Sequence, residues 1–444
     1  MTAARPADHH PVLLGSPYRG YVYGYPHKTA YRRLDPPIPL RDVWADEPTA
    51  GRFLYIHIPF CTMRCGFCNL FTTPNPSDSL VPLYLDALRR QAETVRAAMP
   101  DAQFARLAIG GGTPTYLDEA ALSHVFDIAA NVMGGDPKNT PNGIETSPDT
   151  LTPGKLALLR SRGVDRVSIG VQSFVEAETA GCGRPQSREM VEAALELLAG
   201  AGFPTVNIDL IYGLPGQTVA TWLESLRAAL QYQPQELYLY PLYVRPLTGL
   251  GRSHKSWDDL RLACYREGRA VLLGSGYEQV SMRMFRRVDA PTTRGPTYCC
   301  QEDGMVGLGS GARSYTRGLH YSFDYAVAPR GVKGIISDYL TRDSAEFAVA
   351  DHGITLEDSE QRRRYLLQSI LLVEGLDVCR YEARFGADPA TDFPDLHAFA
   401  ELGLVAFEAG RWLPTPTGLE RSDAIGPWFF SPRVTGFMAE YEAK

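Results

Sequence analysis

The chain has 444 residues, 44% of them hydrophobic, and a formal net charge of −7, which predicts a soluble globular protein of at least two domains. No apolar run approaches the about 20 residues that span a bilayer, and no signal or transit pattern is visible, so we expect a cytoplasmic protein without a membrane span. The acidic balance disfavours non-specific binding to nucleic acid.

The first predicted segment is an aromatic N-terminal arm, residues 1–50. Its aromatic side chains concentrate in one stretch: Tyr18, Tyr21, Tyr23, Tyr25, His27 and Tyr31. Two interpretations are open, because aromatic side chains both pack in cores and stack on flat ligands. The arm either covers the mouth of the domain that follows and stacks on its substrate, or packs along the exterior of that domain.

From residue 51 onward, β-like and helix-like patterns alternate with short breaks. The strands are predicted at 53–58, 104–109, 143–146, 166–171, 205–211 and 236–240, and the helices near 80–98, 118–133, 153–162, 187–201 and 218–231. Repeated βα units imply a parallel sheet with helices on its face. Six units that do not continue to eight favour an α/β fold with a partial (β/α)6 barrel, which we expect over residues 51–330.

Three cysteines, Cys61, Cys65 and Cys68, follow the first predicted strand. A cubane iron–sulfur cluster takes one thiolate per iron, so three cysteines leave one iron without a protein ligand. A structural zinc site would need a fourth ligand, for which His57 is the nearest candidate. Three clustered thiols cannot all pair as disulfides. We therefore predict a [4Fe-4S] cluster with an open iron, at which a small molecule binds and reacts. The other cysteines lack metal-like spacing and are expected to be ordinary thiols: Cys182, Cys264, Cys299, Cys300 and Cys379.

Unusual residues also follow the other predicted strands. In chain order they are Gly110-Gly-Gly-Thr-Pro114, Glu145, Gln172, Asp209 and Tyr243. The C-terminal ends of barrel strands are where chemistry gathers, so we expect one shared site. Glycines let the backbone approach a ligand closely. Glu145 can accept hydrogen bonds from a ribose or an ammonium group, or it can serve only at the start of a helix.

The spacing CxxxCxxC, with Phe67 before the third cysteine and Tyr55-Ile-His-Ile-Pro-Phe60 leading in, resembles the radical S-adenosylmethionine (SAM) superfamily, in particular its HemN-like family. The resemblance implies that the amine and carboxylate of SAM chelate the open iron. It also implies that one-electron reduction cleaves SAM to methionine and a 5′-deoxyadenosyl radical, which abstracts hydrogen from a substrate. A flavodoxin- or ferredoxin-type electron donor is implied as well.

The same resemblance assigns SAM-binding positions one by one. Tyr55, Gly111 and Glu145 fall on a first SAM, and Gly112, Thr113, Gln172, Arg184 and Asp209 fall on contacts to a second SAM; Phe67 and Tyr243 complete the predicted cofactor-binding set. Gln172, Arg184 and Asp209 offer an amide, a guanidinium and a carboxylate for the polar groups of an amino-acid-bearing nucleoside. The alternative is a structural salt bridge between Arg184 and Asp209.

The resemblance continues beyond the barrel. Gly307-Leu-Gly-Ser-Gly-Ala-Arg-Ser-Tyr315 resembles a glycine-rich segment late in HemN-like barrels. Residues 331–444 combine helical runs with a short hairpin within 392–420, which resembles the small, winged-helix-like α+β C-terminal domain of the family. The segment carries no basic stripe, so we interpret it as a substrate lid rather than a DNA-binding module.

Two departures bear on the reaction. HemN dehydrogenases carry a fourth cysteine two residues after the third, where this chain has Leu70, and the aromatic arm is distinctive. These differences put porphyrinogen decarboxylation in doubt. The retained positions for a second SAM lead to the hypothesis that this SAM donates a methyl or methylene group, including cyclopropanation, to a small-molecule secondary metabolite. The alternatives are an anaerobic coproporphyrinogen III dehydrogenase and a haem chaperone. A chaperone would need an axial ligand, for which the candidates are His27, His57 and the Cys299–Cys300 pair.

Overall fold

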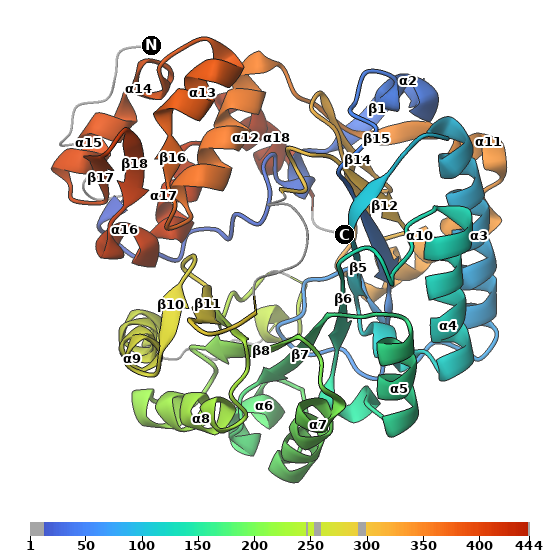
Figure 1. Cartoon of the computed structure of the whole chain (residues 1–444), viewed down its shortest axis with the longest axis horizontal. Helices are drawn as coiled ribbons and strands as arrows, with labels where there is room; N and C mark the ends of the chain where they lie inside the picture. Colours follow the sequence, from blue (N-terminus) through green and yellow to red (C-terminus); the bar gives the residue numbers. More distant parts are fainter. Residues whose placement is uncertain (1–12, 246, 253–258, 292–298, 443–444) are drawn as a thin grey trace.

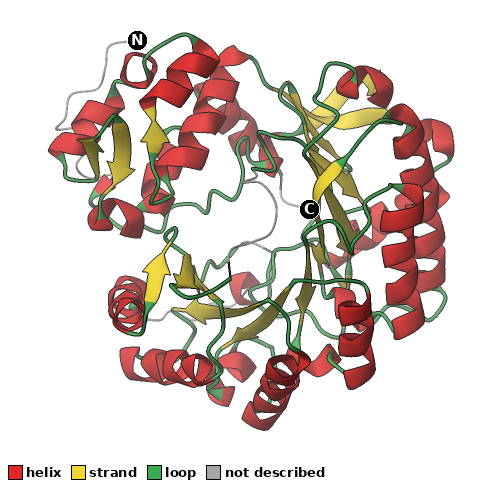
Figure 2. Cartoon of the chain, viewed as in Figure 1, coloured by secondary structure: helices red, strands yellow, loops and turns green. Residues whose placement is uncertain are grey.

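A computed structural model describes residues 13–245, 247–252, 259–291 and 299–442. A curved sheet of 13 strands forms the largest part, with helices along its outer face and a second group of helices across from its inner face (Figures 1 and 2). In spatial order the strands are β1 (Arg32–Pro39), β15 (Val349–Thr355), β14 (Leu319–Ser322), β13 (Arg313–Tyr315), β12 (Met305–Leu308), β2 (Arg52–Ile58), β5 (Phe104–Gly111), β6 (Asn142–Thr146), β7 (Arg166–Gln172), β8 (Thr205–Tyr212), β9 (Glu236–Pro241), β11 (Met284–Arg287) and β10 (Tyr277–Gln279).

All six predicted barrel strands are confirmed, as β2, β5, β6, β7, β8 and β9, and neighbours in this series pair in parallel. β2 shows why the chain folds in this way. Leu54, Ile56 and Ile58 are fully buried among apolar side chains, whereas the intervening Tyr55 stays partly exposed. Since successive side chains of a strand point to opposite faces, one face of β2 packs in the core and the other lines the inside of the barrel.

The predicted helices are confirmed as well. They are α3 (Leu80–Ala98), α4 (Glu119–Asp127) continued by a π-helical turn (Ile128–Val132), α5 (Pro153–Ser161), α7 (Arg188–Ala201) and α8 (Val219–Gln231); α2 (Leu40–Trp44), α6 (Glu176–Gly181) and α9 (Arg261–Gly274) complete the set around the barrel. Hydroxyl caps begin several of them: Thr152, Ser187 and Thr218 each accept a hydrogen bond from a backbone N–H three residues later. Within the described residues no helix is both long and apolar enough to cross a membrane.

The sheet extends further than the six strands predicted from the sequence. β12 pairs in parallel with β2, on the side away from β5, and β13, β14, β15 and β1 continue it in antiparallel fashion. β12 comes from the late glycine-rich segment, and its four residues are too short for a clear alternating pattern. This extension places Arg313 of β13 in the same sheet as β2, the strand that the cysteine loop follows.

The C-terminal part forms a smaller α+β unit, as expected. Its three-stranded sheet has the order β16 (Leu376–Asp377), β18 (Arg411–Pro414), β17 (Val405–Glu408), and its helices are α12 (Asp358–Ile370), α13 (Val378–Phe385), α14 (Pro389–Asp392), α15 (Asp395–Glu401), α16 (Pro416–Glu420), α17 (Ser422–Trp428) and α18 (Pro432–Glu440). A separate hydrophobic cluster fills this unit. Helices α10 (Pro329–Thr341) and α11 (Ser344–Phe347) contact α3 of the barrel. A domain boundary after residue 330, like the one after residue 50, remains a proposal.

Residues 13–31 of the aromatic arm lie between the two units, and β1 and α2 continue the arm at the edge of the large sheet (Figure 1). The Tyr21 ring centroid is 6.4 Å from that of Tyr240 on β9, and the Tyr23 hydroxyl accepts a hydrogen bond of 2.9 Å from Arg313 on β13. Tyr25 belongs to the C-terminal hydrophobic cluster. The arm therefore contacts strands toward opposite ends of the curved sheet, β9 and β13. These contacts favour the interpretation that the arm covers the barrel mouth over the one that it packs on the exterior.

A buried ion pair joins the barrel to the C-terminal unit. Arg283 donates to the carboxylate of Asp423 in α17, and the Tyr243 hydroxyl donates to the same carboxylate at 2.6 Å. The Arg283 and Asp423 side chains are only 9% and 2% exposed. Removing one partner of such a pair leaves the other charge buried without compensation.

We expect Asp423→Asn to lower the free energy of unfolding by about 3–5 kcal/mol, because it leaves the Arg283 charge uncompensated. Urea denaturation measures the change. The matched control is Glu93→Gln, since the Arg89–Glu93 pair is 54% exposed on both sides and should contribute about 0.5 kcal/mol or less. Equal losses in the two variants would contradict a structural role for the buried pair.

Candidate active site

The cysteine loop begins where β2 ends. β3 (Phe60–Cys61) pairs with β4 (Thr73–Pro74), and the turn between them carries the other two thiols. Backbone hydrogen bonds fix this turn: the Gly66 N–H donates to the Cys182 carbonyl at 2.6 Å, and the Leu250 N–H donates to the Gly66 carbonyl at 2.8 Å. A Cβ atom at Gly66 would lie 2.7 Å from the Cys182 oxygen, so only glycine fits here.

Each thiol of the loop has its own hydrogen-bonding partner. Thr113 Oγ1 donates to Cys61 Sγ at 3.6 Å, and an Arg184 amino group donates to Cys65 Sγ at 3.2 Å. Cys68 Sγ lies 3.8 Å from Thr72 Oγ1. All three cysteines are free of disulfides.

The chemistry of this donor set fits an iron–sulfur cluster. Burial raises the pKa of Cys61 to about 12 and also raises the pKa of Cys65, so these thiolates need a positively charged metal beside them. Hydrogen bonds to the sulfurs are a known means of tuning such clusters. In the described part of the chain, no three His, Cys, Asp or Glu side chains gather at the spacing of a single metal ion. Cluster ligands do not need that spacing, because each thiolate binds a different iron.

The glycine turn after β5 packs directly on the cysteine loop. A Cβ atom on Gly110 would lie 2.8 Å from a Glu145 carboxylate oxygen, and one on Gly111, whose φ is +116°, would lie 2.5 Å from the His57 ring. A Cβ atom on Gly112 would lie 2.6 Å from the Phe60 carbonyl oxygen. Gly111 and Gly112 are therefore required by close contacts with other parts of the protein, whereas Gly110 meets only the flexible end of the Glu145 side chain. The close approach to a ligand expected from the sequence stays a prediction.

Glu145 lies beside this turn at the end of β6. Its carboxylate accepts a hydrogen bond of 2.8 Å from the Gly111 N–H. The Glu145 side chain is open to solvent inside the barrel. The protein around it reduces its hydration, and this desolvation raises its pKa. An accessible carboxylate inside the barrel can accept hydrogen bonds from an ammonium or a ribose.

The proposed salt bridge between Arg184 and Asp209 does not form. Besides Cys65, the Arg184 guanidinium donates to the Gly170 carbonyl at 2.7 Å, to Ser147 Oγ at 3.1 Å and to Gln186 Oε1 at 3.0 Å. Most of its N–H groups are therefore used to hold it against the cysteine loop. Arg184 thus binds the cysteine loop itself, a contact that the sequence did not predict.

Asp209 and Gln172 lie on neighbouring strands, β8 and β7. Burial raises the pKa of Asp209 to about 7, and a hydrogen bond of 2.8 Å from Asn207 together with the charge of Arg166 opposes the rise. Gln172 has a φ of +72° at an irregularity in the β7–β8 pairing. Both side chains are partly exposed.

The three aromatic residues of the predicted cofactor-binding set, Tyr55, Phe67 and Tyr243, lie in three different environments. The Tyr55 hydroxyl lies 3.3 Å from His57 Nδ1, on the inner face of β2. Phe67 packs against the small hydrophobic cluster that contains Cys182 and Leu250. Tyr243 is bound through its hydroxyl to Asp423, as described above, so it contributes to the domain contact instead of joining the residues around the cysteine loop.

His57 is not available as a metal or haem ligand. Its Nε2 lies 2.9 Å from the Phe71 carbonyl, its Nδ1 lies near Tyr55, and burial lowers its pKa to about 4. The ring is therefore neutral, donates to a carbonyl and supports the loop. This corrects the sequence-based suggestion that His57 is a zinc or axial ligand.

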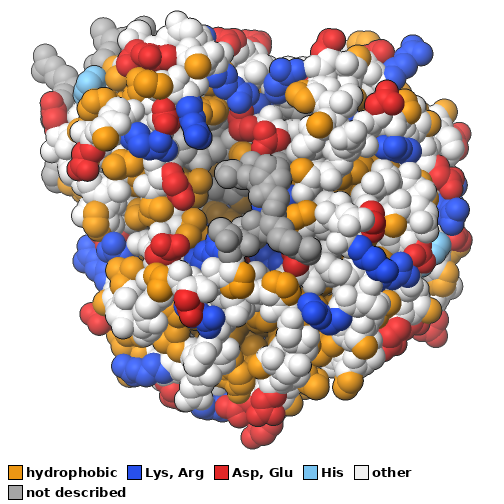
Figure 3. Space-filling model, in the orientation of Figure 1, with side chains coloured by type: hydrophobic (Ala, Val, Ile, Leu, Met, Phe, Trp, Pro, Cys, Tyr) orange, Lys and Arg blue, Asp and Glu red, His pale blue; other side chains and the backbone are white. Residues whose placement is uncertain are grey.

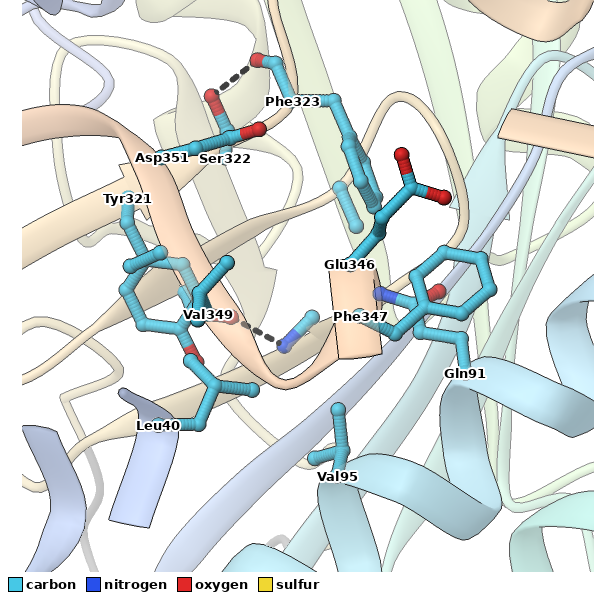
Figure 4. Close-up of a pocket in the computed structure, with 14 residues that line it drawn as sticks. Leu40, Gln91, Val95, Tyr321, Ser322, Phe323, Glu346, Phe347, Val349 and Asp351 are labelled. Atoms are coloured by element: carbon cyan, nitrogen blue, oxygen red, sulfur yellow. Dashed lines mark hydrogen bonds between the residues drawn. The ribbon is translucent and has the colours of Figure 1, made fainter. Parts of the chain in front are cut away.

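A small pocket, shown in Figure 4, lies away from these residues. Gln91 of α3 and Phe347 of α11 line it together with residues of β14 and β15, and none of the predicted cofactor-binding residues does. Gln91 Oε1 already accepts hydrogen bonds of 2.8 Å from the Gly309 N–H and the Tyr339 hydroxyl. The pocket is a gap in the packing between the sheet and its helices.

We expect Arg184→Leu to lower the reduction potential of the loaded cluster, because the variant loses both an N–H donor to Cys65 and a positive charge. A charged hydrogen bond of about 1.5 kcal/mol corresponds to about 60 mV for a one-electron couple. A redox titration followed by electron paramagnetic resonance measures the shift. An unchanged potential at full iron content would show that Arg184 does not act on the cluster.

Comparison with known proteins agrees with this geometry. The Radical SAM superfamily model matches residues 55–229, and the HemN C-terminal domain model matches residues 356–420. The heme chaperone HemW of Synechocystis sp. is 30% identical over 296 residues, which cover 62% of this chain and 68% of the relative. The chain belongs to the HemN-like family of the radical SAM superfamily.

Other HemN-like relatives match over more of the chain. The oxygen-independent coproporphyrinogen III oxidase of Cereibacter sphaeroides is 28% identical over 416 residues, covering 85% of this chain and 89% of the relative. The solved structure of coproporphyrinogen III oxidase (HemN) from Escherichia coli aligns with a TM-score of 0.78, at 24% identity, over 92% of this chain and 96% of that chain. The last match shows that the fold is shared.

Membership of the family implies a [4Fe-4S] cluster and SAM as cofactors. It also makes the chain a radical SAM protein of HemN type. The relatives are named as oxidases and heme chaperones, which favours the porphyrin-related alternatives over methyl or methylene transfer.

Proposed function

We propose that this chain is a HemN-type radical SAM enzyme that takes a hydrogen atom from a carboxylated tetrapyrrole, with coproporphyrinogen III as the first candidate. The observation that carries the proposal is the cysteine loop, in which each thiol has its own hydrogen-bonding partner directly beside the glycine turn and Glu145. The substrate is suggested by the names of the relatives.

When bound, the cluster and SAM supply reductive cleavage of SAM and the radical that takes the hydrogen atom. The chain supplies the arrangement around them. Cys61, Cys65 and Cys68 would hold the cluster, and the glycine turn packs directly on the loop that carries them. Glu145 and Tyr55 would orient SAM, while the aromatic arm and the C-terminal unit exclude water from the barrel mouth.

A second SAM is a further part of the proposal, and it would depend mainly on Gln172 and Asp209. Of the positions assigned to it, Thr113 and Arg184 already donate to the cysteine sulfurs, and the Gly112 N–H donates to the Ile58 carbonyl at 2.8 Å. Gln172 and Asp209 keep polar atoms for a ligand. Equilibrium dialysis of the loaded protein with labelled SAM would separate one bound molecule from two.

A heme chaperone is the second candidate, because the Synechocystis relative has that name. His27 Nδ1 is hydrogen-bonded to Thr29, and His27 Nε2 has no hydrogen bond to any described residue. Nε2 is therefore a candidate axial ligand. We also expect a flavodoxin- or ferredoxin-type electron donor, which the family resemblance implies, and a cytoplasmic location, which the sequence predicts.

The test is an anaerobic reaction of the iron-loaded protein with SAM, reductant and coproporphyrinogen III, analysed by mass spectrometry. We expect 5′-deoxyadenosine together with a tetrapyrrole that has lost carbon dioxide. Formation of S-adenosylhomocysteine would favour methyl transfer instead. Tight haem binding without any conversion of the tetrapyrrole would favour the chaperone.

A further inference from the structure

Buried positive charges gather beside the cysteine loop without acidic partners. Lys28 of the arm places its Nζ 3.5 Å from the centre of the Tyr325 ring and 5.8 Å from that of Tyr23. Arg313 of β13 lies over the same Tyr23 ring at 4.7 Å and donates to the Tyr23 hydroxyl at 2.9 Å. The two cations therefore flank one tyrosine.

No carboxylate in the described ranges forms an ion pair with Lys28, Arg313 or the nearby Arg245. Burial of Lys28, together with the charges of Arg313 and Arg245, lowers its pKa well below the usual range, so its ammonium form would be stabilised by a bound anion. Burying a cation without a counter-ion is costly, so such groups are normally paired. Lys28, Arg245 and Arg313 all stay partly accessible, so an anionic group of a ligand can reach them.

The position of these cations links them to the reaction site. The Tyr325 hydroxyl donates to the Asn69 carbonyl, directly after the third cysteine of the loop. Besides burial, the charges of Arg313 and Lys28 help to lower the pKa of His57, whose Nε2 lies 2.9 Å from the Phe71 carbonyl. Figure 3 shows Lys and Arg side chains among hydrophobic side chains toward the middle of this face of the molecule.

The surroundings add aromatic surface to the charge. Tyr21 and Tyr240 lie with ring centroids 6.4 Å apart, and Tyr21 and Tyr23 with centroids 5.6 Å apart. Rings next to cations suit a flat ligand that carries acidic groups at its edge.

We propose that Lys28 and Arg313, supported by Arg245, form an anion site that binds a carboxylate of the substrate and so positions it beside the cysteine loop. This inference rests on the proposed function for the identity of the substrate, but not for the existence of the site. The same cations could instead hold the carboxylate of SAM or balance the charge of the cluster, and the experiment separates these possibilities.

The experiment compares ligands that differ only in charge, using the iron-loaded full chain. The first pair is coproporphyrin III and its tetramethyl ester, titrated by absorbance. The second pair, anilinonaphthalene sulfonate and uncharged phenylnaphthylamine, tests the site without a tetrapyrrole. We expect the acid of each pair to bind about tenfold or more tightly than its neutral partner.

Lys28→Met should abolish this preference, whereas the exposed Lys333→Met is the matched control and should keep it. Arg313→Lys retains the charge and should keep the preference within about threefold, which provides a second readout if Lys28→Met folds poorly. Anion preference in the second pair alone would support the site while counting against the tetrapyrrole function.

Three results would overturn the assignment. The first is a preference that survives in Lys28→Met. The second is a tenfold weaker SAM affinity of Lys28→Met with unchanged probe binding, which would assign the site to SAM. The third is a loss of iron from that variant, which would assign the cations to the cluster.

Discussion

Cys65→Ala is expected to lose the cluster absorbance and to reduce SAM cleavage to background. Cys65 is one of only three thiols in the loop, and it is the one that Arg184 contacts at 3.2 Å. Two remaining thiolates would leave half of a four-iron cluster without protein ligands. Iron and sulfide content after anaerobic reconstitution, together with 5′-deoxyadenosine formation, measure the effect.

The control for this substitution is Cys379→Ala, which removes an exposed thiol far along the chain and should change neither quantity. A Cys65→Ala protein with full iron and sulfide content would show that Cys65 is not a ligand.

Gly112→Ala should have the next largest effect. The new Cβ atom would lie 2.6 Å from the Phe60 carbonyl oxygen, 2.9 Å from the Pro59 carbonyl carbon and 3.0 Å from Cys61 Sγ. Two of these are backbone atoms that cannot move aside, so the cysteine loop itself must shift. We expect a loss of about 1–3 kcal/mol in stability and a marked fall in iron content.

Gly200→Ala is the matched control, because it lies in α7 with nothing within 4 Å of the added carbon. It should stabilise the protein slightly, since alanine favours helix over glycine. Thermal unfolding and iron analysis of both variants provide the comparison. Full iron content in Gly112→Ala would contradict the tight packing of the turn on the loop.

The barrel could be predicted because its signals are local. Buried parallel strands are short apolar runs, and each predicted run, such as 205–211, lies within an observed strand. The cysteine spacing likewise predicts a cluster without knowledge of the fold, because ligands close in sequence are necessarily close in space.

The remaining features depend on contacts between distant parts of the chain. Arg184 was expected to hold a SAM or pair with Asp209, yet it contacts Cys65, 119 positions away. Tyr243 was placed at a strand end correctly, but its hydroxyl contacts Asp423, 180 positions away. Such partners follow from packing, which no local pattern encodes.

The anion site illustrates the same limit. Lys28 and Arg313 are far apart in the sequence and meet only because β13 joins the barrel sheet and the arm crosses its mouth. The sequence shows that residues 18–31 are rich in aromatic side chains. It does not show that Lys28 and Arg313 both lie against the Tyr23 ring, because that contact depends on the folded chain.

The most direct test of the account is the yield of 5′-deoxyadenosine from SAM in the anaerobic, reduced, iron-loaded protein. The account predicts 5′-deoxyadenosine that depends on Cys61, Cys65 and Cys68 and persists in Cys379→Ala. A fully loaded protein that leaves SAM intact under strong reductant would contradict radical SAM chemistry in this chain.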